Sequence, residues 1–167
     1  MSKQSSSNVH IHYDFEELDP LTPAQEFALK EFKQYKIDSI SMTVNNFVAP
    51  NEGIQETTPS CHELFGRDRV FEHPSHLITH IHREHLAHVH YSDGKWDSTK
   101  PQWSCTSNLA IVYSGFIVDK CDYHFVVHDL HLDDQNQNFD AHDFYTSDDI
   151  DYYVKNARYL REELTPE

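Results

Sequence analysis

Residues 109–132 read LAIVYSGFIVDKCDYHFVVHDLHL and hold two runs that are rich in Val, Ile, Tyr and Phe. The first run, Leu109–Phe116, is separated from the second, Asp122–Leu132, by a short DKCD connection. Two such runs joined by a short polar link predict a β-hairpin. Because side chains alternate along a strand, the second run is predicted to turn two sets of side chains to opposite faces. The first set is Tyr123, Phe125 and Val127, and the second is His124, Val126, His128 and Leu130.

Two helices are predicted before and after this hairpin. Thr22, Pro23 and Gln25 supply a hydroxyl cap, a first-turn proline and the glutamine of a capping box. Apolar residues then repeat at helical spacing, which predicts a helix over about 23–36. Thr146 or Ser147 is predicted to cap a last, amphipathic helix. The order indicates an α+β fold, a small antiparallel β-sheet flanked by an N-terminal and a C-terminal helix, with the helices packed on one face.

The remaining segments divide the chain into a lead-in and one domain. Residues 1–12 begin with a polar, Ser-rich stretch that offers almost nothing to bury, so they are predicted to be disordered. Residues 13–167 are predicted to form a single domain. Two prolines and a glycine interrupt residues 40–64, which predicts a surface insertion with one short strand. From Leu77 onward the pattern is predicted to change to β: Ala87, Val89 and Tyr91 alternate with Leu86, His88 and His90, so His88 and His90 are predicted to share one face of a strand.

The charge of the chain excludes one class of function. It has 28 Asp and Glu against 13 Lys and Arg, a formal charge of −15, and protonating all 14 histidines would leave it at −1. A protein that holds a phosphate backbone by bulk attraction is therefore excluded. Three widely spaced cysteines indicate neither a disulfide framework nor a cysteine zinc site. With no apolar leader or membrane-length stretch, the expected location is cytoplasmic and no membrane partner is expected.

Histidine is the strongest anomaly of the sequence. Five of them, His80, His82, His85, His88 and His90, fall within eleven positions, and the strand predicted at 122–132 carries more. One interpretation is a zinc site, but the spacing matches no zinc signature, so no metal or other cofactor is predicted. A second interpretation is metal-free acid/base catalysis. The third is that most of these side chains are simply solvated strand residues.

Two further segments are candidates for chemistry. Phe65-Gly66-Arg67-Asp68 predicts a turn closed by a salt bridge, unless the arginine serves a ligand. The segment AHDFY at 141–145 precedes the last helix. There, free N–H groups can hold a phosphate beside an imidazole, a carboxylate and a phenol, although a plain helix-entry loop is the alternative.

Several short segments follow one another along the chain in a recognisable order. They are Phe65–Asp68 (FGRD), Leu86–His90 (LAHVH), Gln102–Thr106 (QWSCT) leading to Ile111–Tyr113 (IVY), and Ala141–Asp143 (AHD) before the last helix. In this order, over about residues 62–163, the chain resembles the YafO family of bacterial type II toxins. That family has FGRD, AHIH-like, QFSRT-like, LVY and ARD segments. The helix that carries LTPAQEF is similar to the first helix of the family.

The resemblance implies a RelE-like fold and an endoribonuclease that cuts mRNA, typically on the ribosome. It also implies a cognate antitoxin protein as partner, no direct DNA partner and no required metal. Attack by the ribose 2′-OH needs a base, a proton donor and a cation for the phosphorane. The resemblance implies His88, His90 and Asp143 as catalytic residues and Arg67 and Asp68 as substrate-binding residues. His142 and Tyr145, from the loop before the last helix, are predicted to be catalytic as well, and Trp103 is predicted to bind substrate. His142 stands where the family pattern has Arg.

The acidic composition leaves a second class of function open. On the same fold, a non-catalytic protein-binding module would use its acidic face to recognise a basic protein. A zinc hydrolase with histidine ligands is the third alternative, and metal analysis of the purified protein separates it from the other two.

Overall fold

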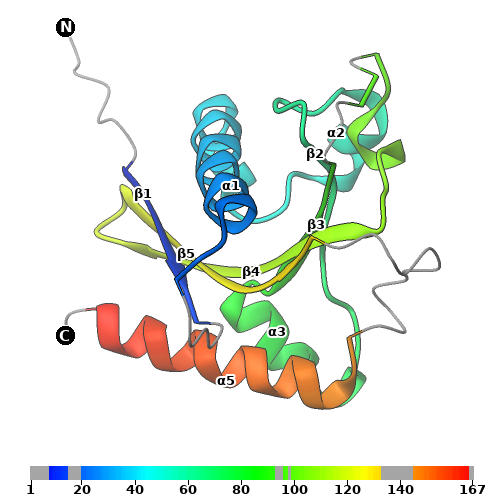
Figure 1. The fold of residues 1–167 in the computed structure, drawn as a ribbon. Helices are drawn as coiled ribbons and strands as arrows, with labels where there is room; N and C mark the ends of the chain where they lie inside the picture. The colour runs from blue at the N-terminus through cyan, green and yellow to red at the C-terminus, as the bar shows by residue number, and fades with distance from the viewer. Residues whose placement is uncertain (1–7, 15–19, 93–95, 98, 133–144, 166–167) are drawn as a thin grey trace, which may run out of the picture.

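A computed structural model of the chain describes residues 8–14, 20–92, 96–97, 99–132 and 145–165. This part centres on a five-stranded mixed sheet in the order β1-β5-β4-β3-β2, with helices on both sides (Figure 1). The strands are β1 (Asn8–Tyr13), β2 (Phe65–Val70), β3 (Ala87–Tyr91), β4 (Leu109–Val118) and β5 (Asp122–His131). The helices are α1 (Pro23–Met42), α2 (Glu52–Thr57), α3 (Ile78–Glu84) and α5 (Ser147–Leu164), with short 3-10 turns η1 (Val44–Phe47), η2 (Ser75–Leu77) and η3 (Gln102–Ser104). The predicted α+β class is confirmed, with one correction: β1 runs parallel to β5.

The predicted hairpin is confirmed as β4 and β5, and it contains a bulge. The pairing register shifts between Val112 and Tyr113, so His128 is an extra residue on β5. An extra residue in one strand changes which side chains share a face beyond it. Leu130 therefore packs with the core beneath α1, although the unbroken alternation had placed it with His128 on the other face.

Helix α1 begins as predicted and covers one face of the sheet. The Thr22 hydroxyl accepts the Gln25 N–H at 3.2 Å, and the Gln25 side chain accepts the Thr22 N–H at 2.8 Å. The helix continues past the predicted end near residue 36 to Met42. Phe32 and Tyr35 are fully buried against the strands and join the larger of two apolar cores.

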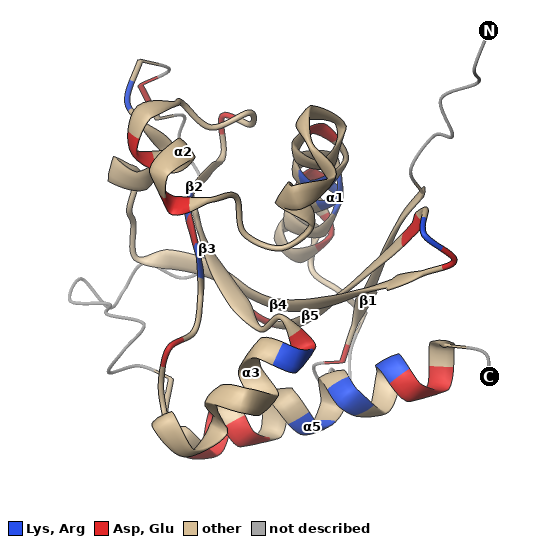
Figure 2. Cartoon of the chain, turned by 180° about the vertical axis from the view of Figure 1, so that it is seen from behind, with Lys and Arg blue, Asp and Glu red and all other residues tan. Residues whose placement is uncertain are grey.

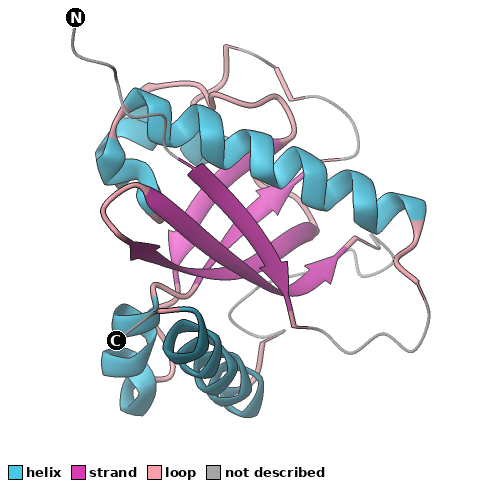
Figure 3. Ribbon diagram, turned by 90° about the vertical axis from the view of Figure 1, so that its left-hand side faces the viewer, coloured by secondary structure: helices cyan, strands magenta, loops and turns pink. Residues whose placement is uncertain are grey.

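Helices α3 and α5 cover the opposite face. Thr146 caps α5 as predicted, since its hydroxyl accepts the Asp149 N–H at 3.2 Å. Ile150 of α5, Ile81 of α3 and Val112 of β4 belong to the second apolar core. The prediction that all helices pack on one face is therefore wrong, as Figure 3 shows. The reason is that β4 buries side chains on both of its faces, so each face needs its own cover.

The prediction that residues 1–12 are disordered is wrong for residues 8–12, because they belong to strand β1 of the sheet. The His10 ring lies 3.4 Å from the Asp122 carboxylate, and His12 Nε2 lies 3.0 Å from His124 Nδ1. These polar contacts join β1 to β5. Because β1 carries few apolar residues, the hydrophobic pattern of the sequence did not indicate a strand here.

Three other local predictions are also wrong. Residues 40–64 contain η1 and α2 in place of the expected strand, and α3 follows Leu77 where a change to β was expected. The FGRD segment is the start of β2, because the Gln55 side chain bonds both the Asp68 N–H (3.0 Å) and the Asp68 carbonyl (2.9 Å) at this sheet edge. None of the described helices is long and apolar enough to cross a membrane.

Candidate functional site

His88 and His90 lie side by side on the face of β3 that is turned away from α1. Their ring centroids are 5.9 Å apart. The alternate residues Ala87, Val89 and Tyr91 are buried in the core beneath α1. The spacing of two residues had predicted this shared face, and the geometry of β3 agrees with it.

His88 is a buried imidazole without a fixed partner. It is 8% exposed, its ring centroid lies 4.7 Å from that of Phe71, and its Nδ1 has no hydrogen-bond partner. No hydrogen bond joins either ring nitrogen to a described residue. Burial, together with His90 and two nearby arginines, lowers the pKa of His88 to about 3. His88 is therefore neutral at pH 7.

His90 has a partner for both of its protonation states. Its Nδ1 lies 3.1 Å from the Ser107 N–H nitrogen and 2.9 Å from the Ser107 carbonyl oxygen. The neutral ring accepts from the N–H, and the imidazolium donates to the carbonyl. Burial lowers the pKa of His90, while the Ser107 carbonyl opposes that shift. In both states Nε2 remains available to a ligand.

Two arginines of β2 share this face with the histidines. Arg69 is paired directly across from His88 in the ladder. The Arg67 guanidinium carbon stands 4.5 Å from the Trp103 ring centroid, and Arg67 Nε donates to the Trp103 carbonyl at 2.7 Å. Other Lys and Arg residues lie along α1 and α5 and on α3 (Figure 2), so basic residues are present on several elements of this acidic chain.

Asp68 lies on the other side of β2 and is not part of this face. Its carboxylate accepts from Tyr113 Oη at 2.7 Å and from Tyr35 Oη at 2.8 Å, and stands 3.6 Å from Lys36 Nζ. The side chains of Asp68 and Lys36 are fully buried. Asp68 is thus enclosed in the core beneath α1, where no substrate reaches it. The salt bridge expected between Arg67 and Asp68 is replaced by one to Lys36.

Tyr145 closes the second core beside the two histidines. It is buried, its ring centroid lies 5.7 Å from that of Phe71, and its hydroxyl donates to Asp129 at 3.3 Å. Burial raises the pKa of Tyr145 and also that of Asp129. Asp129, Ser107 and Arg69 were missed by sequence reasoning, because only strand pairing brings them to this face. The predicted site residues His142 and Asp143 lie outside the described residues.

The other histidines that the structure describes do not form one cluster with His88 and His90. His80 and His82 are exposed on α3, and β4 separates β3 from the histidines of β5. His128 is buried between Ser114 and Asp14, at 2.8 Å from each. Among the residues that the structure describes, no three His, Cys, Asp or Glu side chains are grouped so as to hold a metal ion.

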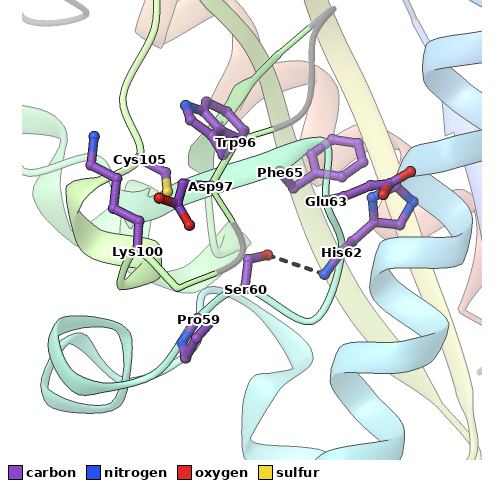
Figure 4. A pocket seen from close by; sticks show the side chains of 9 residues that line it. All are labelled: Pro59, Ser60, His62, Glu63, Phe65, Trp96, Asp97, Lys100 and Cys105. Atoms are coloured by element: carbon purple, nitrogen blue, oxygen red, sulfur yellow. Dashed lines mark hydrogen bonds between the residues drawn. The ribbon is translucent and has the colours of Figure 1, made fainter.

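A separate cavity of about 320 Å³ opens on the far side of η3. Trp96, Asp97 and Lys100 face His62 and Phe65 across it (Figure 4). His62 Nδ1 accepts the Leu64 N–H at 3.1 Å, so its Nε2–H donates to Glu31 at 2.9 Å. This histidine has both nitrogens engaged and lies apart from the face that carries His88.

The buried histidines predict an acid-sensitive fold. The pKa of His88 is about 3 in the folded chain and about 6.5 when unfolded, so the unfolded state binds more protons between these values. Its stabilising effect is complete above pH 6.5 and is lost as the pH falls toward 3. We expect the free energy of unfolding to fall below pH 6.5, with up to about 1.4 kcal/mol per pH unit from His88. Denaturant titrations at pH 7.5 to 5 check this, and an unchanged slope in His88→Phe would contradict it.

Comparison with known proteins identifies the chain. Residues 33–156 match the family described as Toxin YafO, type II toxin-antitoxin system. The chain belongs to the YafO toxin family. The match covers well over half of the sequence and includes the second half of α1, the whole of β2 to β5 and the first half of α5. It confirms the resemblance drawn from the FGRD, LAHVH and QWSCT segments. No curated protein and no solved structure matches the chain.

Proposed function

We propose that this YafO-family toxin is an endoribonuclease that cleaves mRNA on the ribosome and is held inactive by a cognate antitoxin protein. The observation that carries the proposal is one face of the sheet on which His88 and His90 stand next to Arg67 and Arg69. Two imidazoles and a fixed cation are what metal-independent cleavage of RNA requires. On this proposal the chain has the RelE-like fold implied by the family and acts in the cytoplasm.

His88 suits the role of general base. It is neutral at pH 7 and no described residue engages its nitrogens. It takes the proton of the ribose 2′-OH, and the 2′-oxygen then attacks the adjacent phosphorus. Arg67 stabilises the negative charge that develops on the phosphorane, because its guanidinium is permanently charged.

His90 suits the role of general acid. As the imidazolium it donates its Nδ1–H to the Ser107 carbonyl, and this hydrogen bond persists when the proton on Nε2 is given up. Its Nε2 proton passes to the departing 5′-oxygen as the P–O5′ bond breaks. The products are a 2′,3′-cyclic phosphate and a 5′-hydroxyl end. His142 and Asp143 remain proposed contributors from the sequence, while Tyr145 acts by holding Asp129 in place.

Induced expression of the chain alone in bacteria tests the proposal. We expect growth arrest and shortened mRNAs within minutes of induction, and rescue when the adjacent antitoxin gene is expressed as well. His88→Phe provides the matched control, since it fills the same space without a titrating nitrogen. Unchanged growth with abundant, soluble protein would contradict the proposal and favour a non-catalytic protein-binding module.

A further inference from the structure

A second cavity lies at the β2 edge, next to the face that carries His88. It has a volume of about 220 Å³ and lies between α2, β2, α3 and η3. Trp103 and Pro50 supply its flat apolar surface, and Arg69, Glu52, Glu72 and His82 supply its polar groups. The indole of Trp103 is only partly buried. The cavity thus offers a ring surface for stacking next to charged groups.

The two arginines beside this cavity both lie near the ring of Trp103. Arg67 lies 4.5 Å and Arg69 5.9 Å from the centroid of the same Trp103 ring. Arg69 lowers the pKa of Arg67, second to burial, while Glu52 raises it. A phosphate bound beside both guanidinium groups would offset this repulsion between like charges. Arg69 meanwhile donates to Glu72 at 2.9 Å in an exposed ion pair, which is weak enough to exchange for a phosphate.

We infer that this cavity binds one unpaired nucleotide of single-stranded RNA whose base carries an exocyclic amino group. The inference rests on the proposed function and names the substrate class of the same site. The base stacks on Trp103, and the phosphates on either side of it reach Arg67 and Arg69. Stacking on an aromatic side chain requires an unpaired base, which excludes a duplex.

The carboxylates determine which bases fit. Ionised Glu52 and Glu72 only accept hydrogen bonds, so a base in this cavity must donate. Cytosine, adenine and guanine each carry an amino group, and a carboxylate accepts from it as in readout of the cytosine amine. Uracil has no amino group, and its single donor on this edge, N3–H, lies between two carbonyl oxygens that a carboxylate repels. Uracil is therefore disfavoured.

Trp103 fluorescence tests the inference directly. The probe is a set of 2′-O-methyl RNA octamers of cytidine, adenosine or uridine, which lack the 2′-OH and resist cleavage. In the Trp96→Phe chain Trp103 is the remaining tryptophan. We expect the cytidine and adenosine octamers to change its emission and to bind at least tenfold more tightly than the uridine octamer. Equal affinity for all three would overturn the inference.

Variants separate phosphate contact from a structural role. Arg69→Ala should weaken binding and reduce the slope of log K against log salt by about 0.7, the value of one phosphate contact on a single strand. Arg158→Ala, on the exposed face of α5, should leave the slope unchanged. Glu72→Gln should reduce the difference in affinity between the uridine octamer and the other two octamers. The reason is that the glutamine amide can also donate a hydrogen bond, which a uracil carbonyl accepts. An unchanged salt slope in Arg69→Ala would overturn the inference.

The outcome is independent of cleavage. Base-selective, Arg69-dependent binding without cleavage of unmodified RNA supports the inference and contradicts the proposed function. Cleavage at a rate that depends neither on Arg69 nor on the identity of the neighbouring base supports the proposed function and contradicts the inference.

Discussion

Replacing His88 with phenylalanine should lower the rate of RNA cleavage by about 10²- to 10⁴-fold, the range that a general acid or base contributes. His90→Phe should cause a loss of similar size. Phenylalanine is preferred to alanine because His88 is buried against Phe71, where a cavity would add a loss of stability to the loss of chemistry. Single-turnover cleavage of a short RNA by the purified variants measures the effect.

Exposed histidines provide the control for this prediction. His76 lies in η2 and His80 on α3, and both side chains are solvent-exposed. Their alanine variants should cleave at the parental rate. If His88→Phe and His90→Phe also cleave at that rate while remaining folded, the two imidazoles are scaffold residues and the site assignment fails.

Asp68→Ala should lower the free energy of unfolding by about 3–5 kcal/mol, the loss expected when one partner of a buried ion pair is removed. The change leaves the Lys36 ammonium in the core without its counter-charge, and the Tyr35 and Tyr113 hydroxyls without their acceptor. Burial already lowers the pKa of Lys36 to about 8, and Asp68 opposes that shift. Equilibrium denaturation at pH 7 gives the value.

A double variant shows that the ion pair itself causes this loss. Lys36→Met with Asp68→Leu removes both charges and should recover much of the lost stability, because paired apolar residues often replace a buried ion pair at little cost. A loss below about 1 kcal/mol in Asp68→Ala would contradict the enclosed position of this carboxylate.

Local signals predicted the elements whose ends are encoded in neighbouring residues. The Thr22 and Thr146 caps gave the starts of α1 and α5, because a hydroxyl and an amide or carboxylate three residues later satisfy the first N–H groups. The β4–β5 hairpin was predictable from its two apolar runs, whereas its bulge at His128 was not. A bulge depends on how two strands pair, and that information is not local.

Elements held by distant partners escaped prediction. Strand β1 is fixed by side chains of β5 more than a hundred residues away, and β2 by the side chain of Gln55. Helix α3 has no side-chain cap, so nothing marked its start. The FGRD segment looked like a turn because Gly66 and two charges are rare in strands. In the fold, the Cys105 carbonyl lies where a side chain at Gly66 would be, and Asp68 meets its cation from α1.

The same division applies to the candidate site. The alternation of β3 placed His88 and His90 on one face, and the family resemblance selected Arg67 and Trp103. Arg69 and Ser107 could be added only from strand pairing and hydrogen bonding in the fold. Asp68 shows the limit of a shared motif, since a residue in a family segment can serve the core rather than the substrate.

The chemistry of the cleaved ends tests the central proposal most directly. Purified protein should cleave an RNA oligomer in the presence of EDTA and leave a 2′,3′-cyclic phosphate and a 5′-hydroxyl, because the nucleophile is the adjacent 2′-OH. A single 2′-deoxy substitution at the cleaved step should abolish cutting there. Cleavage at the deoxy position, or products with 5′-phosphate ends, would contradict the proposed mechanism.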